Sequence, residues 1–309
     1  MIQSFKTLPQ LFAAFPTEQS AIDHLTALRF GNGRFCPLCG CADEGKVKRM
    51  SAAGVPTNQY KCYSCRGKFS IKVGTIFQDS KLPLRTWFAA IWMITNHPKG
   101  IASTTLATDL GITQKSAWFV LHRLRHAART DSFNAPLSGD VEVDETYVGG
   151  KAKNKHGGKS GKPGTSAMTA VIGAVSRKGN VVAKVIGATT TTVLDGFVHG
   201  VVSPDATTVS TDEHSGYRHL GRTFNHGVVK HKVGTYRSGP FHTNSIEGVW
   251  AQLKRQIIGT HHWVSPKHLD RYVGEMTYRY NRREMEKSQR VNDLLSNVEG
   301  RLTYAILTA

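Results

Sequence analysis

Three acidic residues that lie far apart in the sequence have side chains of the type that binds a hard divalent cation: Asp144, Asp212 and Glu247. Mg²⁺ is bound in proteins mainly through carboxylate oxygens. Asp144 and Asp212 lie within or at the end of β-rich runs, where acidic residues are disfavoured. For any one of them, a solvent-facing strand end is the simpler explanation. Taken together, the three form a candidate metal site.

Three neighbouring carboxylates compete for a place in such a site. Alternation along a strand puts Glu142 on the same face as Asp144, two residues away. The same alternation turns Glu145 and Glu213 away from the faces of their acidic neighbours. All three therefore remain alternative ligands for the candidate metal site.

Glu247 also has a purely structural interpretation. Asn244 stands three positions before it, and this pattern resembles the capping box that begins a helix. Lys254 follows Glu247 by seven positions, almost two helical turns, and so lies on the same face. Another face of this helix carries the apolar stripe that packs on a sheet: Ile246, Val249, Trp250, Leu253 and Ile257. From the residues alone, Glu247 is either a metal ligand or part of a helix cap.

Two Cys-x-x-Cys pairs, in CPLCG and CYSC, could hold a second metal: Cys36, Cys39, Cys62 and Cys65. The gap between the pairs is 22 residues, slightly longer than the usual zinc-ribbon spacing. Four thiolates complete a closed tetrahedral Zn²⁺ site, so this zinc would be structural. Gly40 suits the left-handed turn of such a knuckle, and Cys41 is a spare thiol. Disulfides and free thiols are the alternatives, and a reducing compartment disfavours disulfides.

The stretch IASTTLATDLGITQKSAWFVLHRLR (101–125) predicts two helices with a turn at Gly111 and a cap at Thr113. The second helix has an apolar side formed by Ala117, Val120, Leu121 and Leu124. Its predicted polar side could enter a DNA major groove and is formed by Gln114, Lys115, Arg123 and Arg125. An ordinary helical hairpin with a solvated basic face is the alternative, because such patterns have frequent false positives.

The secondary structure expected to position these residues changes from helical to mixed helix and strand along the chain. Residues 1–30 and 83–128 have helical periodicity, and the cysteine-bearing stretch between them is punctuated by Gly. From Val141, apolar residues alternate as in a strand. The later elements are strands at 168–175, 181–186, 207–211 and 224–230, and helices at 192–201, 244–257 and 266–283. The sequence predicts a mixed sheet with helices on its faces.

Composition favours a polyanionic partner. The chain has 40 Lys and Arg against 22 Asp and Glu, a formal net charge of +18. Neutralising phosphates releases condensed counterions, which favours nucleic-acid binding by a basic protein. Charge alone does not distinguish DNA from RNA or a membrane surface. The longest apolar run, 87–95, is too short to cross a bilayer and no signal-type leader opens the chain, so we expect a cytoplasmic protein without a membrane partner.

Several blocks together resemble a known family. DETYVGGK, TDEHSGYRHL, HTNSIEGVWAQLKRQIIGTHH and YRYNRR, with CPLCG and CYSC, are similar in type and order to bacterial insertion-sequence DDE transposases that have an N-terminal zinc ribbon and an RNase H-like catalytic core. The likeness covers nearly the whole chain. It implies that the three acidic ligands are Asp144, Asp212 and Glu247, with Lys254 as the basic helper. Because related transposases have Asn as the third member, Asn244, about one turn before Glu247, is the alternative third ligand.

The resemblance also divides the chain. We expect an N-terminal helical segment (1–30), a zinc ribbon (31–75), a helix-turn-helix region (76–130), an RNase H-like DDE catalytic domain (136–285) and a C-terminal tail (286–309). Within the catalytic domain, the basic, Gly-rich stretch KAKNKHGGKSGKPG is typical of a loop. Its lysines, like Lys254, would contact phosphates: Lys151, Lys153, Lys155, Lys159 and Lys162. A solvated segment without a partner is the alternative.

The function that the resemblance implies is that of an insertion-sequence transposase, which binds the ends of its element and catalyses metal-dependent cleavage and strand transfer of DNA. Two Mg²⁺ or Mn²⁺ ions would lie at the site, with Asp144 bridging both and Asp212 and Glu247 each holding one. Pairing two DNA ends makes a homodimer or larger assembly the natural expectation. The alternatives are a zinc-ribbon and helix-turn-helix regulator without catalysis, and an RNase H-like nuclease without joining activity.

Overall fold

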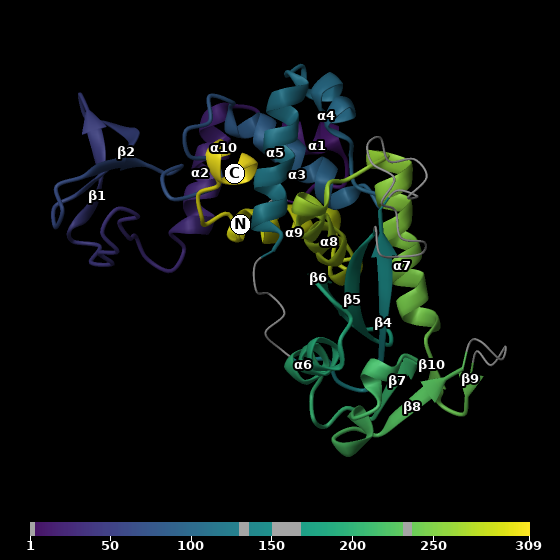
Figure 1. The fold of residues 1–309 in the computed structure, drawn as a ribbon. Coiled ribbons are helices and arrows are strands. Elements are labelled where there is room, and N and C mark those ends of the chain that lie inside the picture. The colour runs from purple at the N-terminus through teal and green to yellow at the C-terminus, as the bar shows by residue number, and fades with distance from the viewer. Residues whose placement is uncertain (1–3, 130–135, 150–167, 231–236) are drawn as a thin grey trace. The chain divides into compact units, whose positions relative to one another are not determined.

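The computed structural model describes residues 4–129, 136–149, 168–230 and 237–309. The chain forms two compact units, one from residues 1–130 with 285–309 and the other from residues 131–284. Figure 1 shows the helices and strands of both units. Among the described residues, no helix is both long enough and apolar enough to cross a membrane.

The first unit contains a small antiparallel sheet. Its strands are β1 (Val47–Ala52), β2 (Val55–Cys62) and β3 (Lys68–Ser70), in the order β1-β2-β3. The core beneath it is minimal: Val47, Tyr60 and Phe69 pack with Cys36 and Cys62. A core of this size needs a metal or covalent crosslink to stay folded. The first unit thus contains the small cysteine-bearing module that the sequence predicted.

The rest of the first unit is helical. Its helices are α1 (Leu8–Ala14), α2 (Glu18–Arg29), α3 (Leu84–Asn96), α4 (Ser103–Leu110), α5 (Gln114–Ala127), α9 (Lys287–Ser296) and α10 (Tyr304–Thr308). The central helix is α3, which contacts α1, α2, α4, α5 and α9 and is apolar on most sides. The residues expected to form a C-terminal tail thus form two helices that belong to this unit.

Helices α4 and α5 form the pair predicted for residues 101–125. Gly111 ends α4 in the left-handed conformation, with φ 62°. Thr113 caps α5, because its hydroxyl accepts a hydrogen bond from the Ser116 N–H at 3.2 Å. The predicted apolar side of α5 is confirmed, since its four residues are buried.

The predicted polar side of α5 was wrong at two positions. Arg123 and Arg125 are only 6% and 1% exposed. The Arg123 guanidinium donates to the backbone carbonyls of Ile76 at 2.8 Å, Gln78 at 2.9 Å and Leu302 at 3.2 Å. Helical periodicity could not reveal this arrangement, because the partners come from segments remote in sequence. Arg123 is a structural crosslink and does not lie on a free DNA-binding face.

The second unit is built on a five-stranded mixed sheet. Its strands are β4 (Asp140–Val148), β5 (Thr169–Ser176), β6 (Val181–Ile186), β7 (Thr208–Asp212) and β8 (His226–Val229). In the order β6-β5-β4-β7-β8, the pairs among β6, β5 and β4 are antiparallel, whereas β7 pairs in parallel with both β4 and β8. The other α-helices and strands described in this unit are α6 (Thr191–Val201), the hairpin β9 (Arg237–Ser238) and β10 (Phe241–His242), α7 (Asn244–Gln256) and α8 (Pro266–Asn281). The same unit also has short 3₁₀ helices at Ser215–Tyr217 and Leu220–Arg222 and a π-helical turn at Ile257–His261.

Both faces of this sheet are covered, as β5 illustrates. Ala170, Ile172 and Ala174 pack in the hydrophobic cluster that contains residues of α6. Val171 and Val175 point to the opposite face and pack with α7 and α8, which lie along the strands in Figure 1. Strands that are buried on both faces have continuous apolar sequences, as this one does. The arrangement is the RNase H-like fold that the resemblance implies.

Replacing Arg123 with Ala should destabilise the first unit, because three buried carbonyls lose their donors. Hydrogen bonds to charged groups contribute about 1.5–3 kcal/mol. We expect the free energy of unfolding, measured by urea denaturation, to fall by roughly 3 kcal/mol. Lys115→Ala, at the exposed start of the same helix, is the matched control and should change it by less than about 0.5 kcal/mol. Equal stability of the two variants would contradict a structural role for Arg123.

Candidate active site

The strand register brings two of the predicted acids together. In the parallel pair of β4 and β7, Glu142 lies opposite Ser210. Asp144 and Asp212 each follow these residues by two positions, so they lie level with one another on the same face of the sheet. Asp212 is the last residue of β7. The site therefore lies at the end of β7, beside the middle of β4.

A third carboxylate, Glu145, joins this pair. Ligand oxygens of Asp144, Glu145 and Asp212 all lie within 4.8 Å of one another. Alternation predicted the face of Glu145 correctly. Glu145 pairs with Ile172 and lies beside Tyr217 on the α6 side of the sheet. Asp144, on the opposite face, contacts α7. Because β7 ends at Asp212, carboxylates from both faces of β4 can approach this residue, so Glu145 belongs to the cluster although it lies on the other face.

Burial and mutual repulsion make this cluster electrostatically unfavourable without a cation. Burial, followed by the nearby charge of Asp212, raises the pKa of Asp144 to about 7. Burial also raises the pKa of Glu145 to about 7, with a further contribution from Asp212. Interaction with the Tyr217 hydroxyl partly offsets this rise for Glu145. Oε1 of Glu145 is buried and makes no close hydrogen bond to any described residue. An oxygen-only donor set with such a poorly satisfied atom fits a hard divalent cation.

Helix α7 is attached to this cluster through an indole. Nε1 of Trp250 donates a hydrogen bond to Oδ2 of Asp144 at 3.0 Å. Gly173 lies opposite Asp144 on β5, and a Cβ atom there would stand 2.5 Å from Cη2 of Trp250. The glycine thus leaves the space that the indole occupies. The sequence identified Trp250 only as an apolar packing residue, and the Gly within the strand VIGAV was the missed signal.

The N-terminus of α7 is capped by a carboxylate from β4. Glu142 is fully buried and accepts hydrogen bonds from the backbone N–H groups of Ser245 at 2.7 Å and Ile246 at 3.1 Å. It also accepts one from the Ser245 hydroxyl at 2.9 Å and pairs with Nε of Arg177 at 2.8 Å. A negative charge is favourable at a helix N-terminus. Glu142 therefore fixes the position of α7 relative to β4.

The expectation that Asn244 caps this helix was wrong. Asn244 is the first residue of α7 and is exposed, and the N-cap residue, Thr243, makes no capping hydrogen bond with its side chain. The Thr243 hydroxyl instead donates to Oε1 of Glu247 at 3.4 Å. Glu142 takes over the cap, which leaves both Asn244 and Glu247 out of that role.

Glu247 lies near the cluster but outside its tight group of three. Its negative charge contributes to the raised pKa of Asp144, after burial and the charge of Asp212. Glu247 is exposed, and so is Lys254, seven residues later on α7. The structure thus brings Asp144 and Asp212 together with Glu145, and holds Glu247 and Lys254 on the exposed side of the attached helix.

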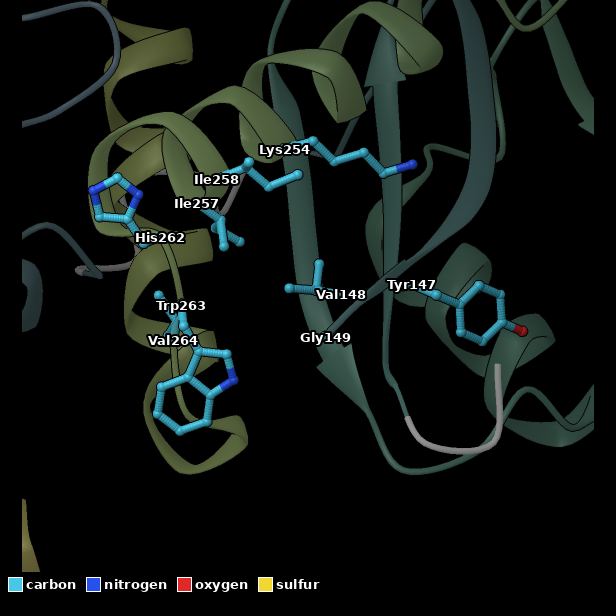
Figure 2. Close-up of a pocket in the computed structure, with 9 residues that line it drawn as sticks. All are labelled: Tyr147, Val148, Gly149, Lys254, Ile257, Ile258, His262, Trp263 and Val264. Atoms are coloured by element: carbon cyan, nitrogen blue, oxygen red, sulfur yellow. The ribbon is translucent and has the colours of Figure 1, made fainter. Parts of the chain in front are cut away.

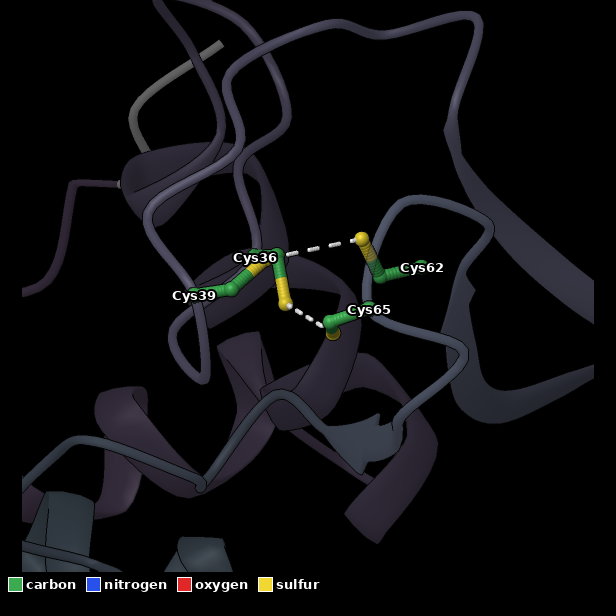
Figure 3. A group of neighbouring side chains, drawn as sticks. All are labelled: Cys36, Cys39, Cys62 and Cys65. Atoms are coloured by element: carbon green, nitrogen blue, oxygen red, sulfur yellow. Dashed lines mark hydrogen bonds between the residues drawn. The ribbon is translucent and has the colours of Figure 1, made fainter.

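The four predicted cysteines form a second cluster, in the first unit (Figure 3). All four sulfur atoms lie within 4.8 Å of one another, and the Cys36–Cys65 and Cys39–Cys62 sulfur pairs are each 3.8 Å apart. A tetrahedral ion with metal–sulfur bonds of about 2.3 Å requires sulfur separations of about 3.8 Å. A disulfide would need about 2.05 Å. The cluster fits zinc, and Cys41 lies outside it, as predicted.

Two further details of the ribbon agree with metal binding. Gly40 has φ +74°, the left-handed turn predicted for the first knuckle. In the second knuckle Arg66 takes the equivalent conformation, with φ 61°. The backbone N–H of Cys65 faces the Cys62 sulfur and is the main cause that lowers the pKa of that thiol to about 7. A thiol that loses its proton near neutral pH is ready to bind a cation.

The predicted DNA-contacting residues fall into three groups. Gln114 and Lys115 are exposed at the start of α5. Arg123 and Arg125 are buried, as described above. The five lysines predicted in the basic loop lie outside the described residues: Lys151, Lys153, Lys155, Lys159 and Lys162.

The raised pKa values of Asp144 and Glu145 predict a pH dependence of metal binding. A cation must displace any proton bound there, so the apparent affinity for Mn²⁺ should rise from pH 6 to pH 8 by roughly ten-fold for one titrating group and a hundred-fold for two. Because both folded-state values lie above the usual range, the metal-free protein should lose stability as the pH rises through about 7.

Isothermal titration with Mn²⁺ at the two pH values, and melting of the metal-free protein, measure both effects. Asp205→Asn, which alters an exposed acid of the same unit, is the matched control and should leave both pH dependences unchanged. Mn²⁺ affinity that is independent of pH between 6 and 8 would contradict the electrostatic description of this cluster.

Sequence comparisons agree with this organisation. Residues 136–281 match the ISXO2-like transposase domain, and residues 16–68 match the transposase zinc-ribbon domain. The chain is 26% identical over 273 residues to an uncharacterized protein in transposable element ISH50 of Halobacterium salinarum, with 84% of this chain and 89% of that protein aligned. That relative is archaeal, so it does not support the bacterial source that the resemblance implied.

Among solved structures, the chain aligns with the simian T-cell lymphotropic virus intasome in complex with PP2A regulatory subunit B56 gamma at 15% identity and a TM-score of 0.27. The alignment covers 56% of this chain and 63% of that one, less than two thirds of its length. A pre-cleavage Mos1 transpososome aligns at 10% identity over 70% and 80% of the two chains, with a TM-score of 0.20. TM-scores this low do not establish a common fold.

The two family matches occupy well over half of the chain. They also occur in the order that the motifs predicted, with the ribbon first and the catalytic domain second. The protein therefore belongs to the ISXO2-like (IS1595) DDE transposases with an N-terminal zinc ribbon, and it is a phosphoryl-transfer enzyme of an insertion sequence.

Proposed function

We propose that this transposase binds the two ends of its element and catalyses both cleavage and strand transfer of DNA, using divalent metal ions held by Asp144, Asp212 and Glu247. The observation that carries the proposal is the group of three half-buried carboxylates at the end of β7, from Asp144, Glu145 and Asp212. The raised pKa values of Asp144 and Glu145 indicate a site that lacks positive charge.

Asp144 is the central ligand in this proposal. It lies level with Asp212 on the neighbouring strand and receives the Trp250 N–H on one oxygen, which leaves its other oxygen available for a cation. Asp212, from the neighbouring strand, and Glu247, from α7, would bind the cations on the two sides of Asp144. Two bound Mg²⁺ or Mn²⁺ ions activate the attacking oxygen and stabilise the leaving oxygen in such a site. The bound cations and the exposed Lys254 would orient the DNA phosphates at this site.

The third ligand has two rivals. Glu145 belongs to the tight group of carboxylates, and Asn244 lies about one turn before Glu247 on α7. Glu247 is favoured because it is a carboxylate whose charge acts on Asp144 and whose helix is attached to β4 at two points. Glu145 is half-buried beside Tyr217, where it could orient or supplement the primary ligands.

The remaining parts of the proposal concern DNA and zinc. The net charge of +18 favours a polyanion. We assign end binding to the zinc ribbon, with one structural Zn²⁺ on its four cysteines, and to the exposed start of α5 at Gln114 and Lys115. The basic loop and Lys254 would hold DNA near the reaction. A cytoplasmic homodimer or larger assembly is expected, because two ends must be joined.

The test uses a plasmid that carries the gene's own flanking DNA, purified protein and Mg²⁺ or Mn²⁺. Wild-type protein should cut at the flanks and join the released ends to target DNA. Asp212→Asn and Glu247→Gln should each reduce cleavage by about a hundred-fold or more, because a ligand of the reacting centre is lost. Asn244→Ala is the matched control on the same helix and should retain activity.

Other outcomes discriminate between the alternatives. Loss of cleavage in Glu145→Gln together with activity in Glu247→Gln would transfer the third ligand to Glu145. Cleavage without joining would indicate a nuclease. Tight binding that needs no metal, with no cleavage by the wild type, would indicate a DNA-binding regulator and contradict the proposed reaction.

A further inference from the structure

A pocket of about 160 Å³ lies in the second unit, between the end of β4 and the end of α7 (Figure 2). Its walls are mostly apolar and come from the end of β4 and from the chain that follows α7: Tyr147, Val148, Ile257, Ile258, Trp263 and Val264. A cavity of about this size holds a single aromatic ring such as benzene. The pocket can therefore accept one flat ring.

The backbone on one side of this pocket is irregular. Ile257–His261 form a π-helical turn after α7, and His262 has φ 59°, a left-handed conformation that is unusual for a residue with a side chain. Such turns and such strained residues occur frequently at functional sites. Here they precede Trp263, which is 63% exposed, and they include Ile258, which is 67% exposed. Two large apolar side chains are thus presented to solvent next to a pocket.

The charge around the pocket suits a polyanion. Among the described residues that line it, none has a carboxylate, and Lys254, which is exposed on α7, contributes an ammonium group (Figure 2). A surface that combines apolar and aromatic groups with an exposed cation is complementary to a nucleotide, which has a flat base and a charged phosphate. A purely apolar partner would not require the lysine.

The pocket also lies close to the reacting centre. Tyr147 and Val148 follow Asp144 by three and four residues on β4, which is roughly 10–13 Å along the strand. Lys254 lies about one helical turn after Trp250, whose indole bonds to Asp144. This separation corresponds to about three or four stacked nucleotides of one DNA strand.

We propose that the pocket holds one base that has been turned out of the DNA stack, within about four nucleotides of the cleaved phosphate, while Lys254 contacts the adjoining backbone. The base would stack on Trp263 and fill the apolar walls. The proposal rests on the proposed function, because it presupposes that DNA ends reach the carboxylates. Unstacking a base has an energetic cost, and stacking on an aromatic side chain offsets it.

The test distinguishes the contribution of one base to binding from that of the rest of the DNA. Duplexes that carry the element end are prepared with a single abasic nucleotide at each position within four of the cleavage site, and binding is measured by fluorescence anisotropy without divalent metal. Trp263→Ala should bind the intact duplex roughly ten-fold more weakly than wild type. At one abasic position the two proteins should bind equally, because the base that Trp263 contacts is missing.

Three variants control the interpretation. Trp263→Phe keeps an aromatic ring and should retain most of the affinity. Val193→Ala removes an exposed apolar side chain from α6 in the same unit and should change nothing on any duplex. Lys254→Ala should weaken binding to intact and abasic duplexes by the same factor, because phosphate contacts do not depend on the base.

Three results would overturn the inference. An equal loss for Trp263→Ala on intact DNA and at every abasic position would show that Trp263 does not contact a base. Unchanged binding by Trp263→Ala, or a change in its oligomeric state in place of its DNA affinity, would assign the pocket to no ligand or to a protein partner. A wild-type protein that neither binds nor cleaves its element ends would contradict the proposed function as well, which distinguishes the two failures.

Discussion

The active site depends on the attachment of helix α7 to strand β4. Glu142 holds the N-terminal N–H groups of the helix, and Trp250, further along it, donates to Asp144. Burying Glu142 would cost several kcal/mol if it were unpaired, but the helix N-terminus and Arg177 compensate its charge. Because Glu142 and Asp144 are neighbours on one face of β4, the two contacts fix both the position and the rotation of α7. Glu247 and Lys254 are thereby held on its exposed side.

The two candidate metal sites, one in each unit, follow the same physical logic. Each gathers groups that repel one another or compete for protons when no cation is bound, as the raised pKa of Asp144 and the 3.8 Å sulfur separations illustrate. In the ribbon, four thiolates leave no open position, which suits a structural ion. At the end of β7, the oxygen ligands and the exposed helix face leave room for phosphates. This arrangement suits an ion that takes part in the reaction.

The order of elements and the identity of the cysteine cluster could be predicted from the sequence, because periodicity and close spacing are local signals. Asp144 and Asp212 were singled out because acidic residues are unusual in β-rich runs and because the family resemblance maps ligands onto them. Errors and omissions arose where distant segments meet. Glu145 reaches the cluster because β7 ends there, and Arg123 is buried because the segments around Ile76 and Leu302 cover it. The cap of α7 comes from Glu142, more than a hundred positions earlier, so no local capping rule could identify it.

The central claim is that the attachment of α7 to β4 delivers Glu247 to a metal held by the strand carboxylates. Anomalous diffraction from crystals of the protein with Mn²⁺ tests this most directly. We predict Mn²⁺ density in contact with Asp144 and Asp212, with a carboxylate oxygen of Glu247 completing the coordination at about the 2.0–2.2 Å typical of a small divalent ion. Mn²⁺ bound by Asp144, Asp212 and Glu145, with Glu247 turned away from the ion, would contradict the claim.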